Sequence, residues 1–272
     1  MTTSTGTSNV PTSTVTPSRH LRIAIVGFGS MGHALSNVIS SSHHHIHAIV
    51  DPSTPQATHT ELSATALSGA DVAIDFTSAT SVLANLPHYL SNGTPVILGT
   101  TGWYDKLPEV RKLVESQNGK VLWSSNFSIG VNLFFRLIEE AAQLFANVEE
   151  YDVWGYELHH YNKADSPSGT AKTAVELLLK NMPRKRRAVF DKLDRKILPE
   201  EIHFASVRGG AVNFEHTIGF DSAADAVIIQ HKARDRSGYA SGAVTAAEWL
   251  IQQQSGFFSF ADFMSALTVK SR

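Results

Sequence analysis

The chain has 272 residues, 42% of them hydrophobic, which is enough to bury a sizeable core in one large or two modest domains. Its 23 basic and 25 acidic residues give a net charge of -2, so no overall field favours nucleic acid or an anionic membrane surface. The absence of cysteine excludes disulfides, thiolate metal sites and cysteine nucleophiles.

The first twenty residues are dominated by serine and threonine, carry Arg19 as their only strong base, and lack an apolar run. We predict a disordered tail over residues 1–20. A secretory signal would need an apolar stretch, and a plastid transit peptide, which the composition suits, is usually longer and richer in arginine. No segment approaches the roughly 20 apolar residues of a membrane span, so we expect a cytoplasmic protein.

A glycine-rich turn follows the first predicted strand, over 21–26. It reads Gly27-Phe28-Gly29-Ser30-Met31-Gly32 and leads into a helical segment. Such glycines allow a tight turn and the close approach of a pyrophosphate to free helix N–H groups. The next predicted strand, over 46–50, ends at Asp51, where a carboxylate can accept ribose hydroxyls. A dinucleotide site is therefore expected, with an ordinary glycine turn as the alternative.

Further strands are predicted over 71–76, 95–98 and 120–123, with a helix over 79–90. This alternation implies βαβ units, a mainly parallel sheet and an α/β fold of the Rossmann-like type. Ligands of such sheets bind beyond the carboxyl ends of the strands, so we expect the loops there to line one crevice. In addition to the glycine turn and Asp51, these loops contain Phe76, Thr77, Gly99, Thr100, Thr101, Ser125, Asn126 and Phe127.

Four histidines lie between the first helix and the second strand: His43, His44, His45 and His47. A metal site would need imidazoles aimed at one point, which consecutive positions in a turn do not provide. We predict a solvated loop.

The pattern changes after Asn126, with a long amphipathic helix over 131–145 and a strand over 148–160. In a regular strand Glu157 and His159 share one face and His160 points to the other, unless the strand ends after His159. Glu157 can then orient His159 or stabilise its charge, which suits a proton donor.

A helix over 170–180 begins at Ser168-Gly169-Thr170, and its free N–H groups and dipole form an anion site. Lys163 adds a full positive charge, so we expect a substrate that carries a carboxylate. Together with the upstream crevice, these residues predict a nicotinamide-dependent reductase of an anionic small molecule.

The run from Glu157 to Thr170, Glu-Leu-His-His-Tyr-Asn-Lys-Ala-Asp-Ser-Pro-Ser-Gly-Thr, resembles the signature of the 4-hydroxy-tetrahydrodipicolinate reductase (dihydrodipicolinate reductase) family of lysine and diaminopimelate biosynthesis. The resemblance extends over residues 21–265. Further matching motifs are Asp75-Phe76-Thr77, Gly99-Thr100-Thr101-Gly102, Asn126-Phe127-Ser128-Ile129-Gly130-Val131-Asn132, Arg208-Gly209-Gly210, Glu215-His216 and His231-Lys232-Ala233.

This resemblance implies a dinucleotide-binding domain over 21–126 and 240–272. It also implies a substrate-binding and oligomerisation domain over 127–239, built on a mixed open sheet and pairing into a homotetramer. Hydride from a reduced nicotinamide would go to the ring of the cyclic dicarboxylate that forms as the substrate loses water.

The resemblance also implies roles for individual residues. His159 would be the proton donor and Lys163 its neighbouring catalytic cation. The nicotinamide would be flanked by 99–101 and 125–127. The two substrate carboxylates would be held by His160, Ser168, Gly169, Thr170 and Arg236.

Three departures from the family pattern bear on the cofactor. Ser30, Pro52 and Ser78 stand where basic residues often occur, while Asp51 would repel a 2′-phosphate. We therefore predict NADH as the preferred cofactor, with NADPH possible and no metal required.

Two other functions remain open at this stage. One is a metal-dependent hydrolase that uses Glu157, His159 and His160 as ligands, which the opposite facing of adjacent strand residues and the nearby Lys163 disfavour. The other is a dinucleotide-binding sensor without turnover.

The remaining sequence predicts an antiparallel set of strands over 203–208, 211–220 and 226–231. Arg184-Lys185-Arg186-Arg187 is a short basic run that we interpret as a solvated loop rather than a nucleic-acid patch. A helix over 240–253 and an aromatic segment over 256–263 close the chain.

Overall fold

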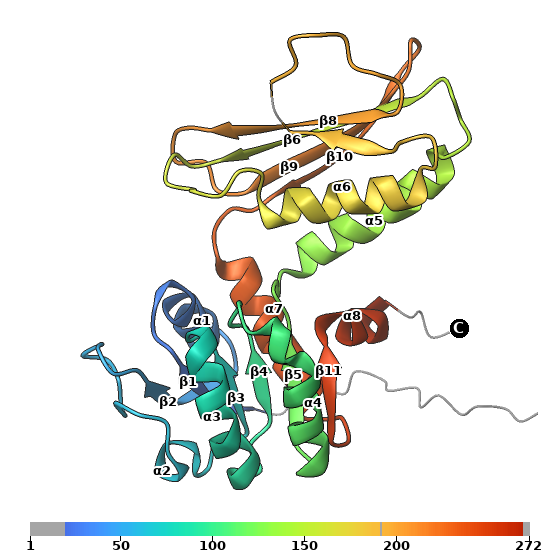
Figure 1. Ribbon diagram of the computed structural model, residues 1–272. Helices are drawn as coiled ribbons and strands as arrows, with labels where there is room; N and C mark the ends of the chain where they lie inside the picture. Colours follow the sequence, from blue (N-terminus) through green and yellow to red (C-terminus); the bar gives the residue numbers. More distant parts are fainter. Residues whose placement is uncertain (1–19, 191, 269–272) are drawn as a thin grey trace, which may run out of the picture. The chain divides into compact units, whose positions relative to one another are not determined.

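The computed structural model describes residues 20–190 and 192–268, so the predicted tail lies outside the described residues except for its last position. The described chain divides into two compact units (Figure 1). The first contains the residues up to Phe28, Ile39–Trp123 and the residues from Thr245 onward, and the second contains Gly29–Val38 and Ser124–Val244.

The first unit is built on a six-stranded sheet in which every neighbouring pair of strands is parallel. Its inner strands are continuous apolar runs, as expected for a sheet that is buried on both faces. This confirms the predicted α/β class. In spatial order the strands are β11 (Gly256–Ser259), β5 (Lys120–Trp123), β4 (Val96–Leu98), β3 (Val72–Asp75), β1 (Arg22–Val26) and β2 (His45–Val50).

Helical segments connect these strands. The helix α1 is Ser30–Ser40, and it begins within the glycine-rich stretch 27–32. Those that follow in the first unit are α2 (Ala64–Leu67), α3 (Ala79–Asn92), the 3₁₀ turn η1 (Tyr104–Lys106), α4 (Leu107–Ser116) and the final α8 (Phe260–Thr268). The predicted aromatic closing segment thus contains both a strand and a helix. The sequence pattern did not predict the strand, because four residues are too few to show a period.

The second unit is built on a five-stranded mixed sheet, with α5 (Ile129–Phe145) and α6 (Gly169–Asn181) on one face (Figure 1). Apolar side chains of both helices pack against alternate residues of the sheet to form its core. The helix α7 (Ser237–Leu250) leads from this unit back to the first. In spatial order the strands are β10 (Ala226–Lys232), β9 (Glu215–Asp221), β6 (Asp152–His159), β8 (Glu201–Arg208) and β7 (Arg187–Val189).

The prediction of an antiparallel set for the last three strands of this unit was wrong for β8. Only β9 and β10 pair with each other, whereas β6 lies between β9 and β8 and pairs with β8 in parallel. The chain passes from β6 to β8 by way of α6 and the edge strand β7, a crossover long enough for the two strands to be parallel. The prediction assumes that strands adjacent in sequence are adjacent in the sheet. This does not hold for β8 and β9, because β6 lies between them.

The interpretation of the basic run after α6 as a solvated loop was wrong for Lys185, although Arg186 and Arg187 are exposed. The side chain of Lys185 is completely buried, and its ammonium group donates to the carbonyl oxygens of Pro199 at 2.7 Å and Glu201 at 2.9 Å. Its charge is balanced by Asp152 at 2.5 Å. Arg187 begins β7 and donates to the carboxylate of Glu201 at 2.7 Å. These cations hold the edge of the sheet together.

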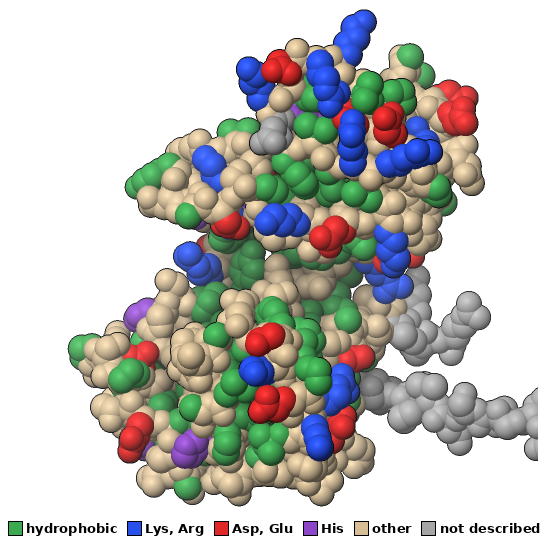
Figure 2. All heavy atoms as spheres, in the orientation of Figure 1, with side chains coloured by type: hydrophobic (Ala, Val, Ile, Leu, Met, Phe, Trp, Pro, Cys, Tyr) green, Lys and Arg blue, Asp and Glu red, His purple; other side chains and the backbone are tan. Residues whose placement is uncertain are grey.

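On the face of the molecule shown in Figure 2, lysine and arginine side chains are interspersed with aspartate and glutamate. This mixture agrees with the near-neutral charge of the sequence. Within residues 20–190 and 192–268, the helices are too short or too polar to cross a bilayer.

Candidate active site

Glu157 on β6 lies at the centre of a buried polar cluster in the second unit and has an exposed fraction of 0%. One of its oxygens, Oε1, accepts hydrogen bonds from the N–H of Ser168 at 3.0 Å, the hydroxyl of Ser206 at 2.8 Å and the guanidinium of Arg208 at 2.7 Å. Burial alone would raise the pKa of Glu157, but the hydrogen bonds it accepts outweigh burial and hold that pKa far below its usual range. The site is therefore built around a fixed negative charge.

Two imidazoles meet at the other oxygen of this carboxylate. Glu157 Oε2 lies 3.2 Å from Nε2 of His159 and 3.3 Å from Nε2 of His216, and these two nitrogens are 3.4 Å apart. An ionised carboxylate only accepts, so both Nε2 atoms carry hydrogen. Among the described residues, Nδ1 of each ring is buried and has no hydrogen-bond partner. Nδ1 is thus the nitrogen of His159 that the described residues leave without a partner.

The two imidazoles line a cavity of about 270 Å³ that lies within the second unit. Its wall also includes the start of α6 and the loop that precedes it. The cavity contacts seven residues that the sequence analysis proposed for the site: Ser125, Asn126, His159, Lys163, Ser168, Gly169 and Thr170.

One end of this cavity is the N-terminus of α6. Ser168 caps the helix, and its Oγ accepts a hydrogen bond from the N–H of Ala171 at 3.1 Å. The remaining first-turn N–H groups have no partner within the helix, and the helix dipole adds positive potential there. The strand β6 ends at His159, one residue before the end predicted from the sequence, and the segment between it and α6 brings Lys163 to the wall. The combination can bind an anion beside a proton donor.

Lys163 is paired on its own loop. Its ammonium group lies 2.6 Å from Oδ1 of Asp165, and this contact is the main cause of the lowered pKa of Asp165. The lysine side chain is 20% exposed, whereas that of Asp165 is 59% exposed. A bound carboxylate can therefore compete with a largely solvated partner for Lys163.

Glycines and Asp51 shape the turn after β1 in the first unit. Gly27 has a φ of +87°, and a Cβ there would lie 2.4 Å from the carbonyl oxygen of Phe76, so no larger residue fits. Asp51 accepts from the N–H of Phe28 at 2.8 Å and from Ser53 at 2.9 Å. These hydrogen bonds, that of Phe28 first, lower the pKa of Asp51 to about 2. Asp51 thus ties the glycine turn to the end of β2.

A second buried carboxylate, Asp75, organises the loops after β3 and β4. Its Oδ1 accepts from the N–H and hydroxyl of Thr77 at 3.0 and 2.6 Å and from the hydroxyl of Thr100 at 3.3 Å. Its Oδ2 accepts from Asn85 at 3.0 Å and Tyr89 at 2.8 Å. Burial, followed by the charge of Asp75, raises the pKa of Tyr89, which keeps its hydroxyl a donor.

Comparison with known proteins bears on the identity of these sites. The model for the dihydrodipicolinate reductase N-terminus matches residues 21–127, and the model for its C-terminus matches residues 130–264. A protein of Christiangramia forsetii named 4-hydroxy-tetrahydrodipicolinate reductase is 32% identical over 91% of this chain and 99% of its own length. One of the same name from Chromobacterium violaceum is 39% identical over 73% of this chain and 75% of its own length.

The chain belongs to the dihydrodipicolinate reductase family. A solved structure titled dipicolinate-bound dihydrodipicolinate reductase from Paenisporosarcina sp. TG-14 has the same fold, with a TM-score of 0.72 over 89% of this chain and 98% of that one at 23% identity. An amine dehydrogenase from Mycobacterium smegmatis is more distant, with a TM-score of 0.54 at 12% identity over 87% of this chain and 94% of that one. The chain is an oxidoreductase, and its cofactor is a nicotinamide dinucleotide.

The residues present fit such a cofactor of the reductase family. A Cβ on Gly99 would lie 2.2 Å from the ring of Phe76, whereas a Cβ on Gly29 would meet nothing within 4 Å. The backbone of Gly29 is thus open to a ligand at the start of α1, where first-turn N–H groups suit a pyrophosphate. Thr77 and Thr100 both donate hydrogen bonds to the buried Asp75. These bonds fix the positions of the loops after β3 and β4.

Two residues proposed to hold carboxylates do not line the cavity of this reductase. His160 is half-buried and contacts the ring of Phe214, with the two centroids 6.3 Å apart. Arg236 is exposed and immediately precedes α7. Phe214 itself is part of the cavity wall, and its ring centroid lies 5.4 Å from that of His159.

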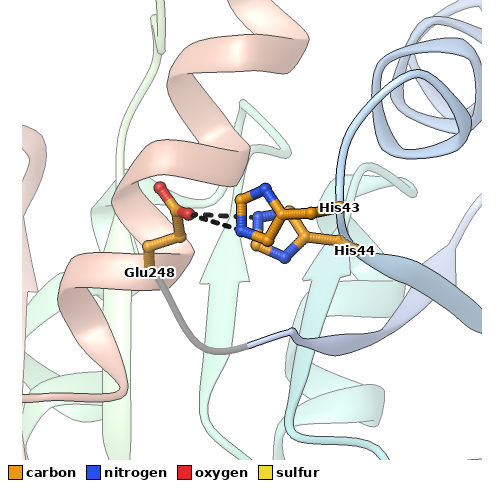
Figure 3. A group of neighbouring side chains, drawn as sticks. All are labelled: His43, His44 and Glu248. Atoms are coloured by element: carbon orange, nitrogen blue, oxygen red, sulfur yellow. Dashed lines mark hydrogen bonds and ion pairs between the residues drawn. The ribbon is translucent and has the colours of Figure 1, made fainter. Parts of the chain in front are cut away.

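The histidine-rich turn was predicted to be a solvated loop, and this was wrong for part of it. His44 is 4% exposed, and its Nε2 lies 3.1 Å from Oε1 of Glu248 on α7, while Nε2 of His43 lies 3.7 Å from the same oxygen (Figure 3). Nδ1 of His44 accepts from the N–H of Leu21 at 3.2 Å. This burial depends on contacts with two distant segments, at Leu21 and on α7, which a local sequence pattern does not reveal.

Three members of the Glu157 cluster were given no role in the sequence analysis: Ser206, Arg208 and His216. Register explains their position, because β6 pairs Glu157 with Ser206 on one side and with His216 on the other. The sequence shows Arg208 and Glu215-His216 as parts of motifs shared with the reductase family, but it does not predict their contact with Glu157. The alternation of side chains between the two faces of a strand indicates which residues of that strand share a face. It predicts a contact between two strands only when the order of the strands in the sheet is known.

Proposed function

We propose that this chain reduces the cyclic dicarboxylate of the dihydrodipicolinate type, formed from 4-hydroxy-tetrahydrodipicolinate, to tetrahydrodipicolinate. The observation that carries the proposal is the cavity that joins His159 to the N-terminus of α6 and to Lys163. A reduced nicotinamide, when bound, supplies a hydride to the substrate ring. The protein must then supply one proton and hold two carboxylates.

His159 is the proposed proton donor. Its Nε2 is held by Glu157 at 3.2 Å, so the proton that leaves must come from Nδ1. The carboxylate of Glu157 stabilises the imidazolium of His159 before the proton is transferred to the substrate. After the transfer, Glu157 is still paired with Arg208 at 2.7 Å, so no unpaired charge remains. Lys163 on the cavity wall favours the anionic substrate and the electron density that develops on its ring.

The N-terminus of α6 is the proposed seat of one carboxylate, with Ser168, Gly169 and Thr170 as ligands. Lys163 supports the same group. His160 and Arg236 remain proposed ligands of the second carboxylate. They lie at the end of β6 and just before α7, and neither has a buried side chain that fixes it elsewhere.

We further propose that NADH is preferred over NADPH. Asp51 has a pKa of about 2 and is therefore negatively charged at neutral pH, beside the place expected for the ribose. No lysine or arginine occurs in the sequence between Arg22 and Lys106, so the loops after β1, β2 and β3 contain no cation for a 2′-phosphate. The kcat/KM for NADH should exceed that for NADPH by about tenfold or more. Equal values, or an advantage for NADPH, would contradict this preference.

A cytoplasmic homotetramer is proposed from the family resemblance, as are a dinucleotide-binding domain over 21–126 and 240–272 and a substrate domain over 127–239. Light scattering of the purified chain tests the assembly. A monomer at micromolar concentration would rule the tetramer out.

The activity itself is tested by NADH oxidation on addition of the condensation product of pyruvate and aspartate semialdehyde. Lys163→Ala should lower kcat by about tenfold or more while the Kd for NADH stays within about twofold of wild type. Lys172→Ala is the matched control, because this lysine lies on α6 and does not line the cavity. A wild-type protein that leaves NADH unchanged with this substrate refutes the proposed reaction.

A further inference from the structure

The imidazole of His216 is placed between the carboxylate of Glu157 and the cap of α6. It lies on β9, directly opposite Glu157 in the antiparallel pairing with β6, and is 2% exposed. Its Nε2 is 3.3 Å from Oε2 of Glu157 and 3.1 Å from Oγ of Ser168. The single nitrogen therefore contacts both the fixed negative charge and a proposed substrate ligand.

The negative charge determines which proton His216 carries. A lone pair on Nε2 would face the lone pairs of Glu157 Oε2, which is repulsive, so the hydrogen must be on Nε2, where it is shared between that oxygen at 3.3 Å and Oγ of Ser168 at 3.1 Å. Burial, as the largest cause, lowers the pKa of His216, which keeps the ring neutral and leaves Nε2 as its one N–H. His216 therefore presents a donor to Glu157 and to the adjacent Ser168.

The hydroxyl of Ser168 receives hydrogen bonds on two sides as a result. Its Oγ accepts from the N–H of Ala171 at 3.1 Å and faces the Nε2–H of His216 at 3.1 Å. A hydroxyl has two acceptor lone pairs and one hydrogen. With both lone pairs directed at donors, the hydrogen of Ser168 is left for an acceptor in the cavity that this residue lines.

We propose that His216 is a positioning residue for substrate recognition, which makes the Ser168 hydroxyl a donor to a carboxylate of the substrate. The inference rests on the proposed dicarboxylate substrate and adds to it a residue that acts through the hydroxyl of Ser168. Without the N–H of His216, the hydroxyl of Ser168 can turn toward Glu157, and a carboxylate then meets a lone pair in place of a hydrogen.

A metal ion is the competing explanation for this cluster. The three atoms Glu157 Oε2, His159 Nε2 and His216 Nε2 lie 3.2 to 3.4 Å apart, which is also compatible with ligands on one face of a tetrahedral site. However, the carboxylate is already paired with Arg208 at 2.7 Å, and Lys163 lines the same cavity. A dication would add charge to a site that already contains two cations, so the structure favours hydrogen bonding.

The test measures the Kd of dipicolinate, a planar dicarboxylate, by calorimetry on the intact protein. Because dipicolinate itself chelates metals, EDTA-dialysed protein is used throughout. His216→Gln places an amide N–H near the position of Nε2, whereas the shorter His216→Asn does not reach it. We expect Asn to weaken binding by about tenfold and Gln to stay within about threefold of wild type.

Double variants with Ser168→Ala isolate the mechanism. If His216 acts through the Ser168 hydroxyl, His216→Asn will change the Kd by less than about twofold once that hydroxyl is absent. The control is His231→Asn, since His231 lies opposite His216 on β10, is half-buried and is not in the cavity wall. It should leave the Kd unchanged. Unfolding temperatures of all variants show whether each remains folded under the conditions used.

Several outcomes would overturn the proposal. Equal Kd values for wild type, Gln and Asn would show that His216 does not position Ser168. A tenfold loss for Asn that persists in the Ser168→Ala background would assign His216 a different role. Stoichiometric zinc in undialysed protein, with binding lost on dialysis, would favour the metal site. Failure of the wild type to bind dipicolinate would instead refute the proposed substrate class, and the inference with it.

Discussion

The described chain contains two clusters of the same composition, each with two histidines and one glutamate. In the second unit, His159 and His216 meet Glu157, and in the first unit, His43 and His44 meet Glu248 (Figure 3). In both, an imidazole Nε2 lies 3.1 or 3.2 Å from a carboxylate oxygen. Composition and this distance alone would therefore assign both clusters the same role.

The difference lies in the other nitrogen of the ring. Nδ1 of His44 accepts a hydrogen bond from the backbone N–H of Leu21, so both nitrogens of this ring have partners and the ring joins two segments of chain. Nδ1 of His159 has no partner among the described residues, and this ring lines a cavity. A histidine that exchanges a proton with a ligand needs one nitrogen that the protein leaves unused, whereas a structural histidine has both engaged.

The largest expected effect separates the two clusters by catalysis. His159→Gln should lower kcat by about a hundredfold or more, because a general acid contributes on that order, while the Kd for NADH changes little. His44→Gln should leave kcat within about twofold of wild type, because His44 is far along the chain from the proposed proton donor and does not line its cavity. Steady-state kinetics of both variants test this. A comparable loss of kcat in both variants would show that an unpartnered Nδ1 does not distinguish a catalytic histidine from a structural one.

The second effect concerns stability. Glu157→Gln removes a fully buried charge that is paired with the partly buried Arg208, and it should lower the free energy of unfolding by about 3 kcal/mol. Glu248→Gln should lower it by less than about 1 kcal/mol, because the side chain of Glu248 is 25% exposed and a neutral amide still accepts from His44. Urea unfolding of the two variants gives the difference. Equal losses would mean that Glu157 is not the centre of a buried ionic cluster.

The smallest effect is a pH dependence that differs between the clusters. Burial, as the largest cause, lowers the pKa of His44 in the folded state below its ordinary 6.5. As the pH falls, this histidine is therefore protonated in the unfolded chain before it is protonated in the folded protein. Stability is thus fully present above that value and falls as the pH drops toward the folded pKa. His216 and His231 act in the same direction. The pKa of Glu157 is also lowered, and its contribution is lost only below about 4.5, at the pKa of an ordinary glutamate.

His44→Gln should therefore make the fall in unfolding free energy between about pH 7 and pH 5 shallower, by at most one proton, or about 1.4 kcal/mol per pH unit. Glu157→Gln should change the slope only at more acidic pH. Denaturant titrations at a series of pH values measure both slopes. An unchanged slope in His44→Gln would indicate that this ring has the same pKa in the folded and unfolded protein.

Much of the first sheet could be predicted from the sequence, because each inner strand is an apolar run followed by a turn and the strands are parallel. The start of α6 after Ser168 was predicted for the same local reasons, whereas β6 ends one residue before the predicted end of its strand. What could not be predicted depends on contacts between distant segments. His216 faces Glu157 through strand pairing, and Lys185 is buried by carbonyl groups of Pro199 and Glu201.

The last strand of the chain has a consequence for synthesis. The strand β11 pairs with β5 at the edge of the first sheet, and the whole sheet of the second unit lies between them in sequence. On the ribosome, β5 leaves the exit tunnel long before its partner is made, and its free edge stays open to pairing with other chains during that time. The second unit has no such gap, because its strands are contiguous in sequence from β6 to β10. We therefore expect the inserted unit to complete its fold first, and the dinucleotide-binding sheet to close only when the carboxyl end of the chain is released.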